Sequence, residues 1–148
     1  MSQANAAGAS SAYRKPLPKI DVWNKPFWDA TQEEIFLAQK DAEGNVWFPP
    51  SPVSPFTRSD QWKWVRLSGH GRVASWVVFH QKYFSGFAED IPYNVALVEL
   101  KEGPRIITNL VGLANEDIQI GMDVELVFRD ATEHFKLPVF QPVVKGPA

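Results

Sequence analysis

The sequence predicts a mainly β protein whose largest unit is a small closed barrel of five short strands. Apolar residues make up 45% of the 148 residues, which is enough to build a buried core. From Gln61 onward, short apolar or alternating runs are separated by turn residues, the pattern of successive strands. Gly69 and Gly71 precede the longest run and indicate a sharp bend at a barrel corner. A β-sandwich is the rival fold, but it usually needs about seven strands.

The chain is expected to divide into a tail, an N-terminal segment and the barrel. Residues 1–12 are mostly Ala, Ser, Gly, Asn and Gln, which predicts a disordered tail. Residues 13–60 form the N-terminal segment, and residues 61–148 form the barrel with an extended C-terminal tail. The first part of the N-terminal segment should be extended, because three prolines each disfavour a helix: Pro16, Pro18 and Pro26.

A short helix is expected to begin near Thr31. Thr31 and Glu34 have the spacing of a capping box, in which the two side chains satisfy the first free amides of a helix. In that helix of about two turns, Ile35 and Phe36 would face inward. Trp28 could pack against its start.

A turn at residues 41–45 and a short strand at residues 46–48 follow the helix. Residues 51–60 then form a long loop without periodicity, and a loop of that length needs something to hold it. The segment contains neither Cys nor His, so apolar residues are expected to hold it. These residues are Trp47, Phe48, Val53 and Phe56.

The barrel strands are predicted from the alternation of apolar residues and the intervening turns. They are residues 61–67, 72–80, 92–100, 105–111 and 124–129, with a short helical turn at 115–117 and an extended tail at 137–142. The second strand is apolar on both alternate faces, which predicts burial on both sides. One face would carry Val73, Val77 and Phe79, and the other Ala74, Trp76 and Val78.

Composition excludes several classes of function. The net charge of −2 provides no general attraction to phosphate backbones, and the absence of cysteine rules out disulfides and thiolate metal sites. The three histidines are scattered, and the chain has no P-loop and no nucleophile elbow. No run is long enough to span a membrane, and the N-terminus does not resemble a signal peptide, so a cytoplasmic location is the default expectation.

Residues 79–87 are unusually aromatic for a connection between strands. Four aromatic residues fall within nine positions, outside a clear strand period. Such a loop can be a docking surface or a ligand cover, or it can fold back onto its own barrel. The sequence leaves both readings open.

Several motifs in order resemble one protein family. They are Pro26-Phe27-Trp28, Phe48-Pro49-Pro50, Ser68-Gly69-His70-Gly71, Pro92 to Leu100, Glu102-Gly103-Pro104-Arg105, Ile120 to Phe128, and Leu137 to Pro142. Together they resemble the zinc-ribbon plus OB-fold proteins that accompany thiolase-like enzymes and are associated with acyl-CoA. The resemblance extends from about Pro26 to Pro142 and implies an OB-type barrel preceded by a rubredoxin-like ribbon.

This chain departs from the family where the ribbon holds its metal. The family has two cysteine pairs, and their positions fall near Lys40, Glu43, Ser54 and Thr57. None of these side chains replaces a thiolate, so a four-coordinate zinc site is not expected and the ribbon should be a degenerate, metal-free one. Because structural zinc contributes folding energy, its loss favours a subunit that is stabilised by a partner.

The resemblance implies a non-catalytic accessory subunit of a thiolase-like complex: a thiolase, an acyltransferase or an aldolase. The partner would be a thiolase-like protein in a hetero-oligomer around a thiolase dimer. A CoA thioester would be the substrate of the complex, and no cofactor of the chain itself is expected. The residues expected at the face toward the partner or the acyl-CoA are His80, Lys82, Tyr83, Phe84, Phe87, Tyr93 and Asn109.

Two other functions remain as alternatives. An OB fold can bind single-stranded nucleic acid through aromatic and basic residues, although the net charge of this chain argues against it. A free-standing acyl transferase would have to use His80, which ends the second barrel strand.

Overall fold

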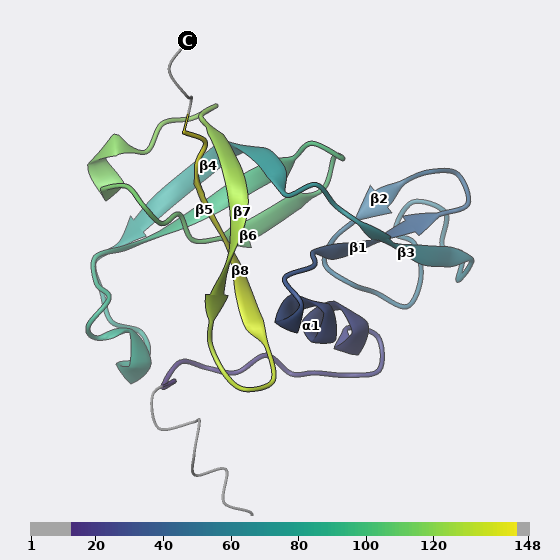
Figure 1. Cartoon of the computed structure of the whole chain (residues 1–148), viewed down its shortest axis with the longest axis horizontal. Helices are drawn as coiled ribbons and strands as arrows, with labels where there is room; N and C mark the ends of the chain where they lie inside the picture. Colours follow the sequence, from purple (N-terminus) through teal and green to yellow (C-terminus); the bar gives the residue numbers. More distant parts are fainter. Residues whose placement is uncertain (1–12, 145–148) are drawn as a thin grey trace, which may run out of the picture.

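The computed structural model describes residues 13–144, so the predicted disordered tail at 1–12 lies outside the described residues. Two antiparallel sheets lie side by side (Figure 1). The smaller sheet has the order β2-β1-β3, and its strands are β1 Leu37–Asp41, β2 Val46–Trp47 and β3 Trp62–Arg66. The larger sheet has the order β6-β5-β4-β7-β8, and its strands are β4 His70–Phe79, β5 Tyr93–Leu100, β6 Arg105–Thr108, β7 Asp123–Asp130 and β8 Lys136–Pro142.

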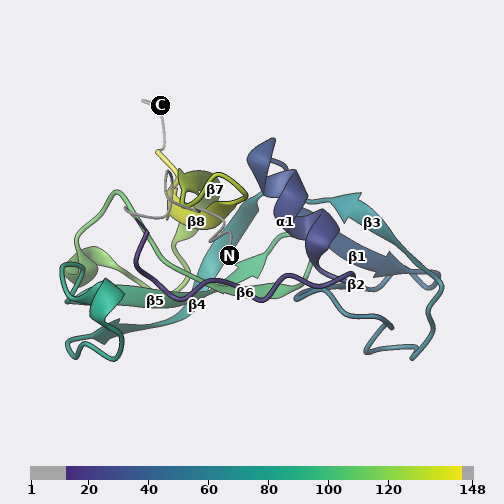
Figure 2. The same ribbon diagram turned by 90° about the horizontal axis from the view of Figure 1, so that it is seen from below.

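Helix α1, Lys25–Gln32, lies between the smaller sheet and strands β7 and β8 of the larger one (Figure 2), and it begins earlier than the capping-box pattern predicts. Pro26 lies in its first turn, where a missing amide costs no hydrogen bond, so this proline starts the helix instead of blocking it. Thr31 lies at the end of α1, and the amide of Glu34 bonds the carbonyl of Thr31. The expected helix after Thr31 is therefore wrong, and strand β1 takes its place.

The larger sheet curls into the predicted OB-type barrel. Its two ends meet where Leu110 forms a bridge with Phe140 of β8. Four of the five barrel strands are those predicted, and one differs. The predicted first strand is β3, which pairs with β1 in the smaller sheet, and the predicted C-terminal tail forms β8 in its place. Pro138 and Pro142 argue against a strand by sequence. Apart from the short bridge at Phe140, however, β8 pairs only with β7, and a strand with a largely unpaired edge tolerates proline.

Strand β4 has a bulge between Val73 and Ser75. Val73 stands opposite Val98 and is buried, whereas Val77 is 52% exposed beyond the bulge. One extra residue moves all later side chains to the other face, so the expected common face of Val73 and Val77 is wrong. Strand β5 approaches β4 so closely at Gly71 that a Cβ there would lie 2.6 Å from the carbonyl oxygen of Glu99, so glycine is required at this position.

One hydrophobic core joins the two sheets. Phe27 from α1 and Phe36 before β1 are in the same buried cluster as Leu67, Val98 and Phe140. Two short 3-10 turns complete the described chain, η1 Ser85–Phe87 and η2 Asn115–Asp117. Within residues 13–144, no helix has the length and hydropathy required to cross a membrane.

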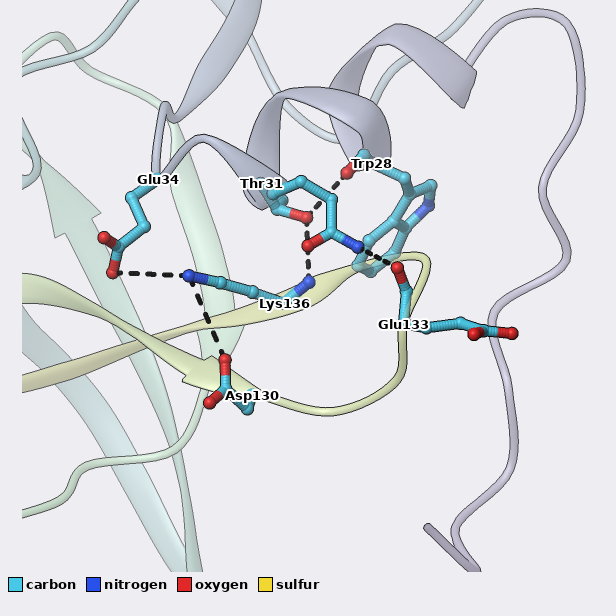
Figure 3. A network of polar contacts seen from close by, with 7 residues as sticks. Trp28, Thr31, Glu34, Asp130, Glu133 and Lys136 are labelled. Carbon is cyan, nitrogen blue, oxygen red and sulfur yellow. Dashed lines mark hydrogen bonds and ion pairs between the residues drawn. The ribbon is translucent and has the colours of Figure 1, made fainter. Parts of the chain in front are cut away.

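Polar contacts attach α1 to the β7–β8 hairpin (Figure 3). The buried Thr31 hydroxyl donates to the carbonyl of Trp28 at 2.6 Å and accepts the amide of Lys136 at 3.0 Å. The Lys136 ammonium lies between the carboxylates of Glu34 and Asp130, at 4.0 and 3.9 Å. The N-terminal segment is thereby held against the side of the barrel.

Candidate functional site

The outer face of strands β4, β5 and β6 is mainly apolar and partly exposed to solvent. Side chains directly across the sheet form rows on this face, because cross-strand neighbours share one side of the pleat. The rows pair Phe79 with Tyr93, Val77 with Val95, and Leu97 with Ile107. Val77 and Ile107 are 52% and 74% exposed. We refer to these residues as the apolar outer face: Val77, Phe79, Tyr93, Val95, Leu97 and Ile107.

This face corrects the prediction that β4 is buried on both sides. Val73 packs into the core, but nothing in residues 13–144 covers Val77 on the opposite face. Antiparallel sheets with one solvated face normally place polar residues there. A strand that is apolar on both faces but buried on only one leaves apolar surface exposed on the protein.

A row of aromatic rings continues the apolar outer face at one end. Tyr93 stacks between Phe79 and Phe87, with ring centroids 5.3 and 5.0 Å apart. Tyr83 meets the edge of Phe79 at 5.8 Å. Each such pair contributes on the order of 1 kcal/mol beyond its buried area, so the loop after β4 is ordered by its own aromatic residues. Phe87 folds back onto Tyr93, as one interpretation of the loop expects, whereas Tyr83 is 64% exposed, so a docking role for the loop stays a prediction.

The N-terminal segment packs against the end of this row. The ammonium of Lys15 lies 5.1 Å from the centre of the Phe87 ring and 2.7 Å from the carboxylate of Asp90. The chain passes so close to η1 that a Cβ on Gly86 would overlap the carbonyl oxygen of Arg14. Glycine is therefore required at the point where the segment crosses the loop.

The structure brings together only some of the residues predicted for this site. Phe87, Tyr93 and Asn109 line one small cavity of about 210 Å³ beside the barrel seam. Tyr83 and the 58% exposed Phe84 lie on the outside of the same loop. The remaining two, His80 and Lys82, are exposed. Among residues 13–144, no hydrogen-bond partner orients the ring of His80.

Asn109 has a supporting position behind the aromatic row. Its amide group donates to the carbonyl of Asn94, and the buried Asn94 side chain bonds both the amide and the carbonyl of Leu110, at 2.6 and 2.8 Å. Asn94 also donates to the side-chain oxygen of Asn115 at 3.1 Å. These bonds satisfy buried backbone groups and hold the segment after β6 against the start of β5.

Charges near the apolar outer face are balanced. At the end of the face away from the aromatic row, Arg105 pairs with Glu99 at 3.1 Å and Arg72 with Asp123 at 3.4 Å. A hollow of about 720 Å³ beside η1 is lined by residues of both signs, namely Arg14, Lys15, Arg129, Glu89, Asp90 and Asp130. A groove that follows a nucleic-acid backbone is positively charged, and this surface is not.

Sequence reasoning missed the strand residues of the site. The sequence predicts ordinary strand positions for Val77, Leu97 and Ile107, and it indicates no role at the site for Phe79. The signal was present, because the run after Gly71 is apolar on both alternate faces. Only the cross-strand register shows that its second face stays uncovered.

The fold defines a class of protein: an OB-fold domain, here with a partly exposed apolar face on strands β4, β5 and β6. Residues 64–129 match the family description "ChsH2, C-terminal OB-fold domain". A DUF35 domain-containing scaffold protein from Pyrococcus furiosus is 33% identical over 127 residues, which are 81% of this chain and 93% of that protein. The chain belongs to the DUF35 family.

The chain is also similar to part of a longer protein and to one chain of a solved complex. A probable enoyl-CoA hydratase alpha subunit from Thermomonospora curvata is 39% identical over 131 residues, 88% of this chain. This chain covers only 40% of that relative. A chain of the Ltp2–ChsH2(DUF35) aldolase superposes with a TM-score of 0.78 at 39% identity, covering 86% of this chain and 100% of that one.

Proposed function

We propose that this protein is a non-catalytic accessory subunit of a thiolase-like enzyme complex, and that the apolar outer face docks on the thiolase-like partner. The observation that carries the proposal is the uncovered apolar surface on β4, β5 and β6, continuous with the aromatic row. Its rim of paired charges resembles the polar rim around the apolar centre of a protein–protein interface.

Similar proteins support an accessory role. The superposed ChsH2 chain is part of an aldolase together with Ltp2, and the Pyrococcus relative is described as a scaffold protein. A fold alone does not define a function, so the proposal depends on the combination of that complex with the uncovered face. The family resemblance further favours a hetero-oligomer around a thiolase dimer, with two copies of each chain, in the cytoplasm.

The proposal assigns the reacting groups to the partner. A histidine that acts as a general base is normally oriented by a second group, and His80 has no such neighbour within the described part of the chain. His80 and Lys82 instead extend from the loop beside Tyr83. We expect this loop to buttress the partner's active site, where a CoA thioester would be the substrate of the complex.

We also infer that the smaller sheet corresponds to the ribbon of the family. Its β1–β2 turn and the turn at Ser54 lie where the ribbon's cysteine pairs would be. The residues at those positions are Lys40, Glu43, Ser54 and Thr57, and this set does not fit zinc, which takes thiolate, imidazole or carboxylate ligands in a tetrahedral arrangement. No step of the proposed function uses a metal.

Co-purification with a partner tests the docking face. The chain is co-expressed with a tagged Ltp2-type thiolase-like protein from the same genome, and Ile107→Lys is compared with Ile120→Lys. Both isoleucines are exposed, at 74% and 64%, but only Ile107 lies on the apolar outer face. Ile107→Lys should abolish co-purification, because a lysine buried at an interface centre is costly, whereas Ile120→Lys should retain it.

The aromatic loop has its own test in the same assay. The double variant Tyr83→Ala with Phe84→Ala should weaken the complex at least tenfold, because exposed aromatic residues are frequent anchors of interfaces. Equal co-purification of all variants, or a wild-type chain that does not co-purify with the thiolase-like protein, would contradict the proposal. A salt-dependent rise in anisotropy with single-stranded oligonucleotides would favour the alternative of a nucleic-acid-binding OB module.

A further inference from the structure

Two turns next to the smaller sheet are joined by a side-chain hydrogen bond. The first turn joins β1 to β2, and Asp41 begins it. One carboxylate oxygen of Asp41 accepts the backbone amides of Glu43 and Asn45, each at 3.0 Å. The Asn45 side chain donates to both carboxylate oxygens, at 3.2 and 3.0 Å. Asp41 is only 5% exposed, so its carboxylate is used within the fold.

The second turn begins at Ser54, which is fully buried. The Ser54 hydroxyl oxygen accepts the amides of Phe56 and Thr57 at 3.1 and 3.2 Å. Its proton is donated to the second carboxylate oxygen of Asp41 at 2.7 Å. The backbone closes the same turn, with the amide of Arg58 on the carbonyl of Ser54 at 2.8 Å.

The two residues therefore have complementary bonding roles. An ionised carboxylate only accepts hydrogen bonds, whereas a hydroxyl donates once and accepts on its two lone pairs. Ser54 uses both lone pairs on its own turn and its single proton on Asp41. The bond between them is assisted by the charge of Asp41 and joins positions 13 residues apart.

We propose that the hydrogen bond from Ser54 to Asp41 holds these two turns together in the place where a metal ion would join them in a ribbon. Of the four positions considered for cysteine, only Ser54 contributes its side chain, whereas Glu43 and Thr57 contribute backbone amides. Asp41 is the neighbour of Lys40 in the sequence. Across residues 13–144, no group of three or more His, Cys, Asp or Glu side chains is arranged to hold a metal ion. The proposal goes beyond the docking function and does not depend on a partner.

Other polar contacts extend this arrangement along the loop after β2. The side chain of Gln39 bonds both the amide and the carbonyl of Ser51 at 2.8 Å. The indole of Trp62 donates to the carbonyl of Pro52 at 2.8 Å. The expectation that apolar residues hold this loop is met for Trp47, which is buried, and for Phe48, which packs against the core. It is wrong for Val53 and Phe56, which are 43% and 62% exposed.

The proposal is tested with two variants matched in charge. Asp41→Asn keeps the shape of the side chain and an oxygen for the local amides, but it removes the acceptor for the Ser54 proton. Glu43→Gln removes one negative charge from the same turn, at an exposed side chain. Both are studied as the full chain by thermal unfolding and by hydrogen exchange of the segment 54–58, with and without EDTA.

Asp41→Asn should increase exchange at the amides of Phe56 and Thr57 at least tenfold and lower Tm by several degrees, whereas Glu43→Gln should match the wild type. EDTA should leave the wild-type Tm unchanged. If Asp41→Asn does not fold, Ser54→Ala is used instead, and exchange is measured at the amides of Glu43 and Asn45, which are bonded to Asp41 and not to Ser54. Unchanged exchange in the folded variants, or an EDTA-sensitive Tm with stoichiometric metal by elemental analysis, would overturn the proposal.

Discussion

The attachment of α1 to the barrel yields a prediction that separates a hydrogen bond from packing. Thr31 is fully buried, and its hydroxyl connects the carbonyl of Trp28 to the amide of Lys136. Thr31→Val preserves the shape of the side chain and removes the hydroxyl. Thr31→Ser preserves the hydroxyl and removes one methyl group.

The two variants should differ in size of effect. Thr31→Val leaves the Lys136 amide without an acceptor, which costs about 2 kcal/mol for a largely buried group. Thr31→Ser loses the burial of one methyl group, about 0.8 kcal/mol. For a domain of this size, 1 kcal/mol corresponds to roughly 3–4 °C, so Thr31→Val should lower Tm by about 6–8 °C and Thr31→Ser by about 3 °C.

Thermal and urea unfolding followed by circular dichroism measure both variants against the wild type. Gln32→Ala is a useful companion, because it removes a side-chain bond to the carbonyl of Glu133 at the same junction from a less buried position. We expect it to cost less than Thr31→Val. A Thr31→Ser variant that loses as much stability as Thr31→Val would show that packing, not the hydroxyl, holds the junction and would refute the reasoning.

Three further predictions follow from single positions. Gly86→Ala should displace the chain at Arg14 and so break the ion pair and cation–π contact of Lys15, which lowers the free energy of unfolding by about 1–2 kcal/mol. Trypsin should then cleave faster after Arg14, and an unchanged cleavage rate would contradict the close contact. Asn94→Leu should cost about 2–4 kcal/mol in urea unfolding, because it leaves both backbone groups of Leu110 unpaired, and a loss below about 1 kcal/mol would contradict that role. Desolvation raises the pKa of Asp41, but hydrogen bonds from Ser54 and Asn45 outweigh it and hold the pKa below its ordinary value. The stability that depends on ionised Asp41 is therefore fully present above the unfolded pKa of about 4, and it is lost as the pH falls through the lower pKa of the folded state. Since Asp41→Asn lacks this carboxylate, its Tm should fall less in acid than the Tm of Glu43→Gln.

Local patterns in the sequence were sufficient for much of the barrel. The alternation around Ala96 and Val98 predicts β5, and the turn before Arg105 predicts the hairpin to β6; the structure contains both. The 3-10 turn at residues 115–117 was also expected from its residues. Such features depend on neighbours in the chain, so they can be read without knowing the fold.

Other features required long-range contacts. Thr31 has the pattern of a helix start, yet its hydroxyl is used by Trp28 and by Lys136, 105 residues away. The prolines of β8 argue against a strand, but pairing with β7 makes it one. The residues around Asp41 predict only a turn, because no neighbouring residue indicates that Ser54, 13 positions away, bonds its carboxylate.

For the candidate site, the sequence alone determined the chemistry: an aromatic loop after an unusually apolar strand, in a chain without cysteine and with little net charge. The tertiary structure decided which of these side chains meet and which face remains open. The bulge after Val73 turns Val77 and Phe79 outward, and the register places them beside Val95 and Tyr93. A period of two residues makes a strand's faces predictable only up to such an insertion, and the identity of the covered face depends on what the rest of the chain packs against.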